Sequence, residues 1–588
     1  MQFVLSEYSM KFSIDESKLS DEEKNNPTIQ LLLEIIRQQA EVIEQLKDEI
    51  NRLKNHPRKP KIKPSNLEKK KKAKSKKGKR AGSEKKFKTG ELEIHKVKEI
   101  EPDYIPSGSR FIDYRDFVVQ DVKIEPYNTR YRLKVYETPD GDYIAGKLPE
   151  NLNGKHFGPS LIRFVLYQYY HCHVTQPLLL EQLREIGIDI SSGHLNNLLI
   201  ESKEEFHREK DDILSAGLQV CSYINVDDTG ARHKGKNGYC TYIGNEAFSW
   251  FASTERKNRI NFLKCLRAGH SDFYLNIEAL TYMEVNKLPK DQLQSLIDHF
   301  DDMFPSQQHW DTFLKDNGIV KPRHRKIATE GALIGSIVEH GISNNLVIVS
   351  DDAGQFNVLC HALCWVHAER LIGKVVPFSD QARKDLEDVK EQIWNLYNDL
   401  KEYKHNPNAK DRQRLKKAFD KIFTTKTDSA TLNEALKRIH KNKAELLLVL
   451  ERPDIPLHNN SAENAIREYV KKRKISGGTR SESGRLARDT FTSLKKTCRK
   501  LGISFWRYLK DRIENIGFYP TLSSMIKERA LRAAKNIKSD KLPVNIGSFV
   551  GNRCPGTSKY VPVDETTYMG QETSSRVDLF LSNCLKPG

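Results

Sequence analysis

The chain has 588 residues, of which 38% are hydrophobic and 30% are charged. This length allows roughly three to four domains. It contains no run of about 18 uncharged apolar residues, which excludes a membrane-spanning helix, and residues 1–27 lack the pattern of a secretion signal. Nine cysteines are scattered along the chain with no CxxC pair. We therefore expect no disulfide framework and a cytoplasmic location.

The net charge of +18 is concentrated in one stretch. Between Arg52 and Lys88 there are 18 basic residues and only two acidic ones, while the rest of the chain is nearly neutral. Residues 56–90 are also rich in proline and glycine, so they are predicted to form an unfolded basic linker. Its densest part contains Lys70, Lys71 and Lys72. Such lysines bind DNA phosphates by counterion release; the alternative is a solubilising linker.

A heptad pattern precedes the linker. Isoleucine recurs at one position and mostly leucine three residues later, which favours a parallel two-stranded coiled coil over residues 28–55. The isoleucines are Ile29, Ile36, Ile43 and Ile50. We expect a homodimer formed through this segment, preceded by a loose N-terminus at 1–27. The alternative is an amphipathic helix that packs on its own domain.

Two small segments are predicted next. Residues 91–150 have the pattern of short strands, with Pro-Asp-Gly marking a turn. Residues 151–215 are predicted to be helical, and two helices separated by a turn at Gly187 and capped by Ser191 or Ser192 have helix-turn-helix spacing. This spacing alone is weak, because any short helical hairpin produces it.

The longest predicted domain covers residues 216–515. It contains an apolar strand over 218–230, two further candidate strands, and a later apolar strand over 346–354. Both apolar strands run into pairs of acids. Helical, polar insertions are expected near 266–330 and 376–454, and a C-terminal helix and tail at 516–588. Three strands in a row followed by a later strand resemble a ribonuclease H-like layout, so the fold class is α+β and multidomain, with a mixed sheet flanked by helices.

Three acids are the candidate catalytic residues. Asp227 and Asp351 follow the two apolar strands, and Glu463 lies near the start of a later helix. Carboxylates on such elements can converge on two divalent cations, Mg²⁺ or Mn²⁺, which are hard ions that prefer oxygen ligands. Alternatively, acids after strands serve as turn residues, and Glu463 completes a helix cap.

Several strings of residues point to a known family. In chain order they are VDDTG (226–230), VSDDAGQF (349–356), CWVHAER (364–370), PLHNNSAENAIRE (456–468), KKRKISGG (471–478) and TSLKKTCRKLGISFWRYL (492–509). They resemble the insertion-sequence-66 family of bacterial transposases, which carry a DDE-type catalytic domain. The resemblance runs from the coiled coil to about residue 515.

The resemblance implies roles for individual residues. Asp227, Asp351 and Glu463 match the family's three catalytic, metal-binding acids. Arg473 and Lys474 match its Arg-Lys pair. Together with Arg467, this pair is expected to contact DNA phosphates; the alternative is a solvated helix face. His367 is expected either to lie near the site or to be a packed residue.

Two departures from the family are visible. Residues 91–150 contain no cysteine, whereas the family usually has a zinc-binding cysteine cluster there, so no zinc is expected in that segment. The family's Asp-Glu-Thr motif reads Asp-Asp-Thr at 227–229. A zinc ion held by Cys360, Cys364 and His367 is the less favoured interpretation of that cluster.

The sequence therefore predicts a DNA transposase with metal-dependent cleavage and strand-transfer activity. The expected partners are double-stranded DNA, as element terminal inverted repeats and as target, and small accessory proteins of the kind common near this family. Its expected location is the bacterial cytoplasm, in association with the nucleoid. A catalytically inactive DNA-binding regulator derived from a transposase is the alternative.

Overall fold

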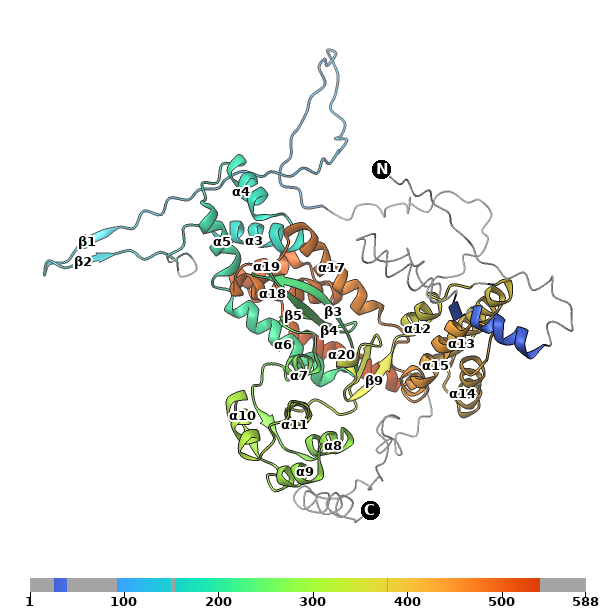
Figure 1. Ribbon diagram of the computed structural model, residues 1–588. Coiled ribbons are helices and arrows are strands. Elements are labelled where there is room, and N and C mark those ends of the chain that lie inside the picture. The colour runs from blue at the N-terminus through green and yellow to red at the C-terminus, as the bar shows by residue number, and fades with distance from the viewer. Residues whose placement is uncertain are drawn as a thin grey trace, which may run out of the picture.

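A five-stranded mixed sheet lies at the centre of the molecule (Figure 1). The computed structural model describes residues 26–36, 38–39, 92–149, 152, 154–377 and 379–539. The strands are β3 (Tyr223–His233), β4 (Lys236–Gly244), β5 (Ser249–Thr254), β8 (Val347–Ser350) and β9 (Cys360–Leu363). Their order is β5-β4-β3-β8-β9. The first three are antiparallel and the last two run parallel to β3, which fits the ribonuclease H-like core that the sequence predicts.

Local sequence explains the main features of this sheet. A two-residue turn joins β3 to β4, and both of its residues, Lys234 and Gly235, have positive φ. This geometry matches the twist of a hairpin and fixes the pairing of His233 with Lys236. All four residues of β8 are buried, as expected for a central strand covered on both faces.

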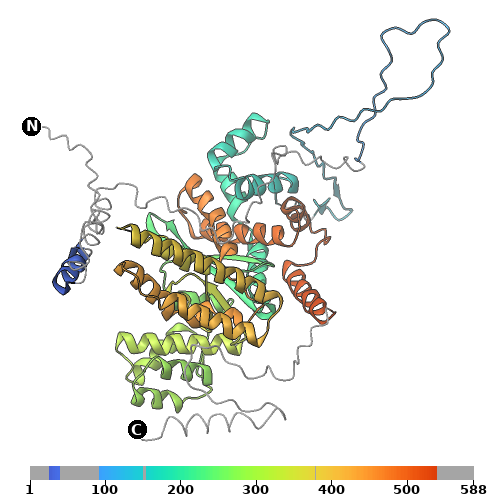
Figure 2. The ribbon, with the colours of Figure 1, turned by 90° about the vertical axis from the view of Figure 1, so that its right-hand side faces the viewer.

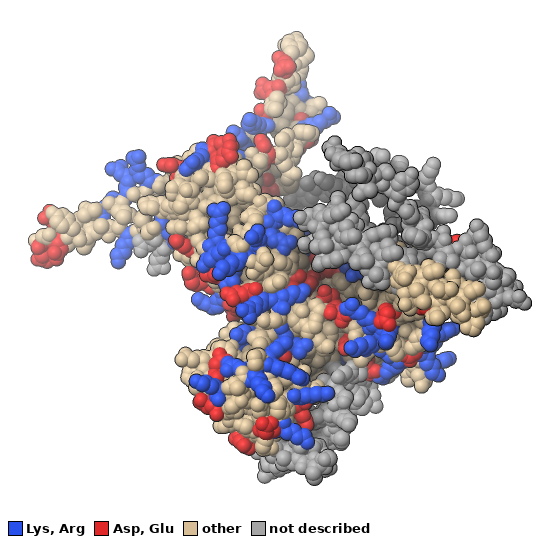
Figure 3. Space-filling model, in the orientation of Figure 1, with Lys and Arg blue, Asp and Glu red and all other residues tan. Residues whose placement is uncertain are grey.

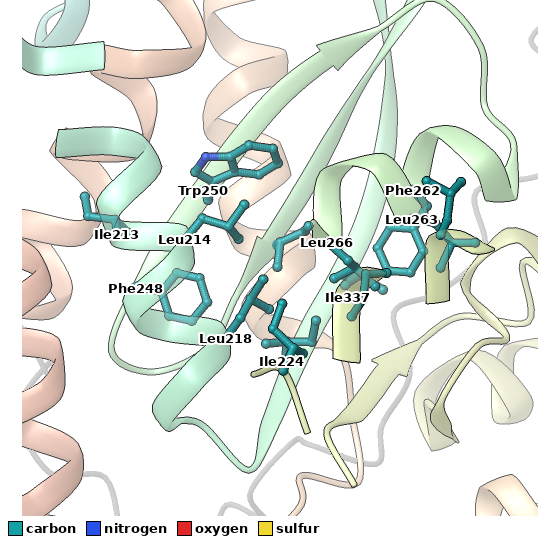
Figure 4. Close-up of a cluster of buried hydrophobic side chains, with 14 of the residues drawn as sticks. Ile213, Leu214, Leu218, Ile224, Phe248, Trp250, Phe262, Leu263, Leu266 and Ile337 are labelled. Carbon is teal, nitrogen blue, oxygen red and sulfur yellow. The ribbon is translucent and has the colours of Figure 1, made fainter. Parts of the chain in front are cut away.

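One face of the sheet packs against α6 (Glu204–Val220), α7 (Arg259–Leu266) and α11 (Pro322–Glu339). Figure 4 shows Leu218 of α6 beside Ile224 of β3, and Leu214 of α6 beside Trp250 of β5. The other face packs against α17 (Asn460–Ser476), whose Ala462 and Ile466 join Tyr242 and Phe251 in a separate buried cluster. Residues 225 and 227 point to this second face, because side chains alternate along a strand.

The edge of the sheet that is formed by β5 is covered by α18 (Glu482–Lys500). Three backbone N–H groups of β5 donate hydrogen bonds to α18 side chains that are spaced about one helical turn apart. The acceptors are Thr497, Ser493 and Asp489, at 3.0, 2.9 and 2.7 Å. An edge strand with unpaired N–H groups would invite pairing with another chain, and these bonds prevent it.

The structure corrects the predicted start of the first apolar strand. Residues 218–220 end α6, and β3 begins at Tyr223. Leu218 is fully buried on the same helix face as Leu214, so its apolar character comes from helix packing rather than from the strand.

Two groups of helices interrupt the sheet. The first lies between β5 and β8 and contains, besides α7 and α11, the helices α8 (Ile277–Val285), α9 (Lys290–Ile297) and α10 (Gln307–Asp316), with β6 (Phe273–Tyr274) and β7 (Met303–Phe304). The second follows β9 and contains α12 (Trp365–Ile372), α13 (Asp380–His405), α14 (Ala409–Phe423), α15 (Ala430–Lys441), α16 (Lys443–Leu446) and η5 (Leu448–Leu450). Figure 2 shows the two groups as separate bodies beside the sheet.

Helices that precede the sheet and helices that follow it in the chain pack together beside the core (Figure 1). They are α3 (Pro159–Leu166), the π-helix η3 (Tyr167–His171), α4 (Gln176–Glu185), α5 (Ser192–Ile200), α19 (Phe505–Glu514) and α20 (Leu522–Ser539). Between α4 and α5, Gly187 has φ of +86° and Ser191 caps α5 by accepting a bond from the His194 N–H. Recognition of DNA by α4 and α5 stays a prediction.

The segment before these helices is extended. Residues 92–149 contain one hairpin, β1 (Val135–Glu137) and β2 (Tyr143–Ala145), turned at the Pro-Asp-Gly sequence. Most large apolar side chains of this arm are exposed. Of the predicted coiled coil only 28–36 and 38–39 are described; residues 27–36 are helical, and Leu32 and Ile36 are about half exposed. Lys70, Lys71 and Lys72 lie outside the described residues.

Two further expectations concern the cysteines and membranes. Among the described residues, six cysteines are free thiols and Cys360 is disulfide-bonded. Among the helices that the structure describes, none combines the length and the apolar character needed to cross a bilayer.

A close approach between α6 and the sheet generates a test of the core. A methyl group at Gly217 would lie 2.5 Å from the ring of Phe248, which is fully buried. We expect Gly217→Ala to lower the free energy of unfolding by about 1–3 kcal/mol, despite the better helix propensity of alanine. Chemical denaturation would measure this change.

Gly193→Ala is the matched control. Gly193 also lies in a helix, and a methyl group there would meet only the Ser191 hydroxyl at 4.0 Å. This variant should be neutral or stabilised by up to about 1 kcal/mol. Equal effects of the two substitutions would contradict the proposed packing of α6 on Phe248.

Candidate active site

Asp227 and Asp351 occupy equivalent positions on neighbouring parallel strands. Asn225 of β3 pairs with Val349 of β8, and each acid lies two residues farther along its strand direction. Because the strands are parallel and neighbouring strands lie about 4.8 Å apart, the two carboxylates lie on the same face of the sheet and at the same edge, where β8 ends. Asp351 follows its strand as predicted, whereas Asp227 lies within β3, which continues to His233. Their charges interact, since Asp351 raises the pKa of Asp227.

Glu463 is brought to this edge by Asn459, which directly precedes α17 and is 2% exposed. The Asn459 side chain donates a hydrogen bond to the carbonyl of Val226 at 2.8 Å and accepts one from Asn225 at 2.9 Å. One turn later, the Glu463 N–H donates to the Asn459 carbonyl at 3.2 Å. The glutamate is thus fixed within one helical turn of the strand that carries Asp227.

A second link ties β8 to the same helix. The Cys364 N–H donates to the carbonyl of Ser350, next to Asp351, at 3.0 Å. The thiol of Cys364 accepts a hydrogen bond from the Asn459 N–H at 3.1 Å. Burial raises the pKa of Cys364 to about 11, so the thiol stays protonated and is poorly suited to bind zinc. The structure therefore gives Cys364 a packing role.

Burial of Asp227 gives it an unusual charge state. Loss of water contact raises its pKa to about 7; the backbone N–H of Asp228, 2.8 Å from Oδ1, opposes this, and the charges of Asp351 and Asp228 add to it. Burial therefore disfavours the ionised form of this carboxyl group, and a positive charge placed beside it would favour that form.

Asp228, the second acid of the Asp-Asp-Thr motif, is a further acid beside the site and lies within β3 rather than in a turn. Its carboxylate accepts bonds from the Thr241 hydroxyl at 2.5 Å and the Gln355 amide at 3.0 Å. Burial raises its pKa above the ordinary value. These partners hold Asp228 against β4 and the turn after β8, so it adds negative charge near Asp227.

Glu463 is paired with a guanidinium group that sequence reasoning missed. Arg370 of α12 approaches both carboxylate oxygens, at 3.0 and 3.4 Å, and His367 lies 3.7 Å from one of them. Burial lowers the pKa of His367, and the charges of Glu463 and Asp351 oppose that shift. The available signal was the spacing of His367 and Arg370, three residues apart on one helix face.

Asp352 does not join this cluster. Its carboxylate is bound by Arg438 at 2.5 Å and by Asn442 at 3.2 Å, both outside the site. Among the described residues, Asp227, Asp351 and Glu463 do not form a group whose ligand atoms all lie within 4.8 Å of one another. Asp227 and Asp351 share one face of the sheet, while Glu463 is paired with Arg370.

The basic residues expected to contact DNA differ in exposure. The Arg467 side chain is 69% exposed and lies 3.8 Å from Glu463. Lys474 is exposed. Arg473 donates to the Thr229 hydroxyl at 3.2 Å and to the Gly230 carbonyl, so it is partly occupied within the chain. Lys and Arg side chains gather over the middle of the face in Figure 3.

Lys472, in the same basic run, is buried rather than exposed. Its ammonium group lies 3.5 Å from the centre of the Tyr169 ring and donates to the Tyr169 carbonyl at 2.9 Å. Burial lowers its pKa to about 7. This lysine fastens α17 to η3 and is removed from any surface that DNA could contact.

Comparison with known proteins places the chain in a family. Residues 336–487 match the family model described as "Transposase IS66 family". This range includes Asp351 and Glu463, while Asp227 lies before it. The chain is also similar to "Uncharacterized protein y4jO" of Sinorhizobium fredii (strain NBRC 101917 / NGR234), at 44% identity over 303 residues, which are 51% of this chain and 94% of that protein. The chain belongs to the IS66 family of transposases.

Proposed function

We propose that the chain is a DNA transposase that cuts DNA at the ends of an insertion sequence and joins those ends to target DNA. The observation that supports this best is the register of β3 and β8, which gives Asp227 and Asp351 equivalent places at one sheet edge. Asn459 then ties the helix of Glu463 to the same edge. Three acids on two strands and a helix are the donor set that phosphoryl transfer with two cations requires.

Asp227, Asp351 and Glu463 are the proposed ligands. Two Mg²⁺ or Mn²⁺ ions held there would supply activation of the attacking oxygen and stabilisation of charge on the phosphate. Asp227 would give up the proton that its raised pKa retains near neutral pH. Glu463 would exchange its Arg370 partner for a cation, which leaves the guanidinium beside the site and able to contact a DNA phosphate.

DNA binding would involve two groups of basic residues. Arg467, Arg473 and Lys474 lie on the helix that carries Glu463, so they would grip phosphates next to the bond that is cut. The linker lysines would add affinity without sequence preference, and the helices α4 and α5 would recognise the terminal repeats. Small accessory proteins would act with the transposase.

The first test removes one carboxylate charge. Asp351→Asn should lower cleavage of a labelled duplex that carries element ends by at least about a hundredfold in Mg²⁺, because a neutral amide binds the cation poorly and stabilises the transition state less. DNA binding, measured by gel shift, should be unchanged or tighter, since a negative charge is lost.

Asp352→Asn is the matched control, because it changes the adjacent acid, whose partners Arg438 and Asn442 lie away from the site. It should retain cleavage. Normal cleavage by Asp351→Asn would refute the assigned role. A wild-type chain that binds the ends but never cuts them would instead favour the inactive DNA-binding regulator.

The linker lysines are tested through salt. Replacing Lys70, Lys71 and Lys72 with glutamine should reduce the slope of log affinity against log salt concentration by up to about 2.7, at ~0.9 for each phosphate that is no longer neutralised. Fluorescence anisotropy at several salt concentrations would measure it. Replacing the exposed Lys384, Lys410 and Lys417 of α13 and α14 is the control. An unaltered slope would show that these lysines do not bind DNA phosphates and that the linker only connects the domains.

The homodimer is proposed to form through residues 28–55. The described part of this segment leaves Leu32 and Ile36 about half exposed in the single chain, as expected for a helix that packs on a partner. Replacing Ile36 and Ile43 with lysine should yield monomers by light scattering. Lysine at Gln38 and Gln45, on the outer face of the heptad, should not. An unchanged mass for the isoleucine variants would place the dimer interface elsewhere.

A further inference from the structure

A second cluster of metal-binding side chains lies in the helical group between β5 and β8. His270 and Asp272 flank the turn after α7, and His340 directly follows α11. One ligand atom from each residue lies within 4.8 Å of the others. This cluster is built from different elements than the three acids, and no role proposed above uses it.

The two imidazole rings are stacked face to face. Their centroids are 3.4 Å apart and their planes differ by 11°. Two imidazolium cations at this distance would repel strongly, so at least one ring is neutral and offers a nitrogen lone pair. Neutral imidazole is the commonest metal ligand in proteins.

Asp272 completes the set. Both of its carboxylate oxygens lie 2.9–3.0 Å from Nε2 of His340. The hydroxyl of Ser336, a fully buried residue, donates to Oδ1 at 3.1 Å and fixes the carboxylate. Support of this kind, in which a second residue orients a ligand, is typical of metal sites.

The charges around the cluster leave room for a cation. Arg267 is a positive group beside the cluster, but its guanidinium donates to the backbone carbonyl of Asp272 and lies over the ring of Phe273, 5.0 Å from its centre. His340 stands at the C-terminal end of α11, where the helix dipole favours positive charge. His270 is exposed, so the cluster is open to solvent on one side.

We propose that His270, Asp272 and His340 form a site for a zinc ion. Two imidazole nitrogens and one carboxylate favour zinc over Mg²⁺ or Ca²⁺, and a fourth position would remain open for water. Zinc ligands at ~2.1 Å from the ion lie ~3.4 Å from one another, whereas the ligand atoms here lie up to 4.8 Å apart. Because an imidazole nitrogen binds a metal in the plane of its ring, the exposed His270 side chain would rotate out of its stack on His340 to close the site. The ion would replace the proton shared by His340 and Asp272.

The ion would stabilise the segment that leads to the proposed active site. It would link the turn at 270–272 to the end of α11, and only residues 341–346 separate His340 from β8, which leads to Asp351. This inference does not rest on the proposed function, because its ligands include none of the three acids.

Zinc binding can be measured on the full chain by competition with a chromogenic chelator, with zinc as the only added metal. The measurement uses the Asp351→Asn background, which weakens binding at the catalytic edge. We expect one zinc per chain that excess Mg²⁺ does not displace. His270→Ala and His340→Gln should each abolish it, while Ser336→Ala should weaken it by ~10- to 100-fold.

His299→Ala is the matched control. His299 belongs to the same helical group and lies 2.9 Å from Asp302, but this pair has no second histidine. Zinc binding should be unchanged in this variant. Zinc should also raise the melting temperature of the parent chain and leave that of His340→Gln unchanged.

His340→Gln guards against loss of the fold, because glutamine still donates a hydrogen bond to Asp272. Zinc binding of parental affinity and stoichiometry in both histidine variants, or none in the parent, would overturn the proposal and leave a simple ion pair between His340 and Asp272. Zinc binding is measured separately from DNA cleavage, so failure of the zinc proposal would not affect the proposed role of Asp351.

Discussion

The buried side chain of Asn459 holds the candidate active site together. Its side-chain amide donates to the carbonyl of Val226 and accepts a hydrogen bond from the Asn225 side chain. Its backbone N–H donates to the thiol of Cys364, and the backbone N–H of Cys364 donates to the carbonyl of Ser350. Strand β3, strand β8 and helix α17 therefore meet at one residue. Because a buried polar group without a partner costs more than a formed bond gains, this junction fixes the helix relative to the sheet edge.

In the part of the chain that the structure describes, the edge strand β5 has no further strand beside it, and its free N–H groups are protected from pairing with another chain. Three side chains of α18 bind the free N–H groups of β5, so a helix closes that edge. The two strands that lead to Asp227 and Asp351 lie in the interior of the sheet. The long insertions then enter beside β5 and after β9, where they lengthen the connections without disturbing the register of β3 and β8. The geometry of the two aspartates depends on that register alone.

The sequence predicts the parts of this site that depend on strand patterns. The apolar runs that lead to Asp227 and Asp351 are recognisable because parallel strands in a buried sheet are continuously apolar. The continuation of β3 past Asp227 to His233 was not predicted, because its residues there are mostly polar. Arg370 and Asn459 could not be found in this way, because their partners lie 93 and 233 residues away in the chain. Lys472 illustrates the opposite error: in a basic run it is expected at the surface, yet Tyr169 covers it. The start of β3 was missed because α6 is equally apolar where it ends.

Charge balance links this geometry to function. Near Asp227 three carboxyl groups lie together, and burial keeps the first of them partly protonated at neutral pH. Glu463, only one helical turn from Asn459, is instead neutralised by Arg370. The negative charge of the site is therefore reduced by partial protonation of Asp227 and by the guanidinium group beside Glu463. Divalent cations would replace both, which concentrates positive charge where a phosphate must be held and leaves Arg370 beside it to bind the same anion.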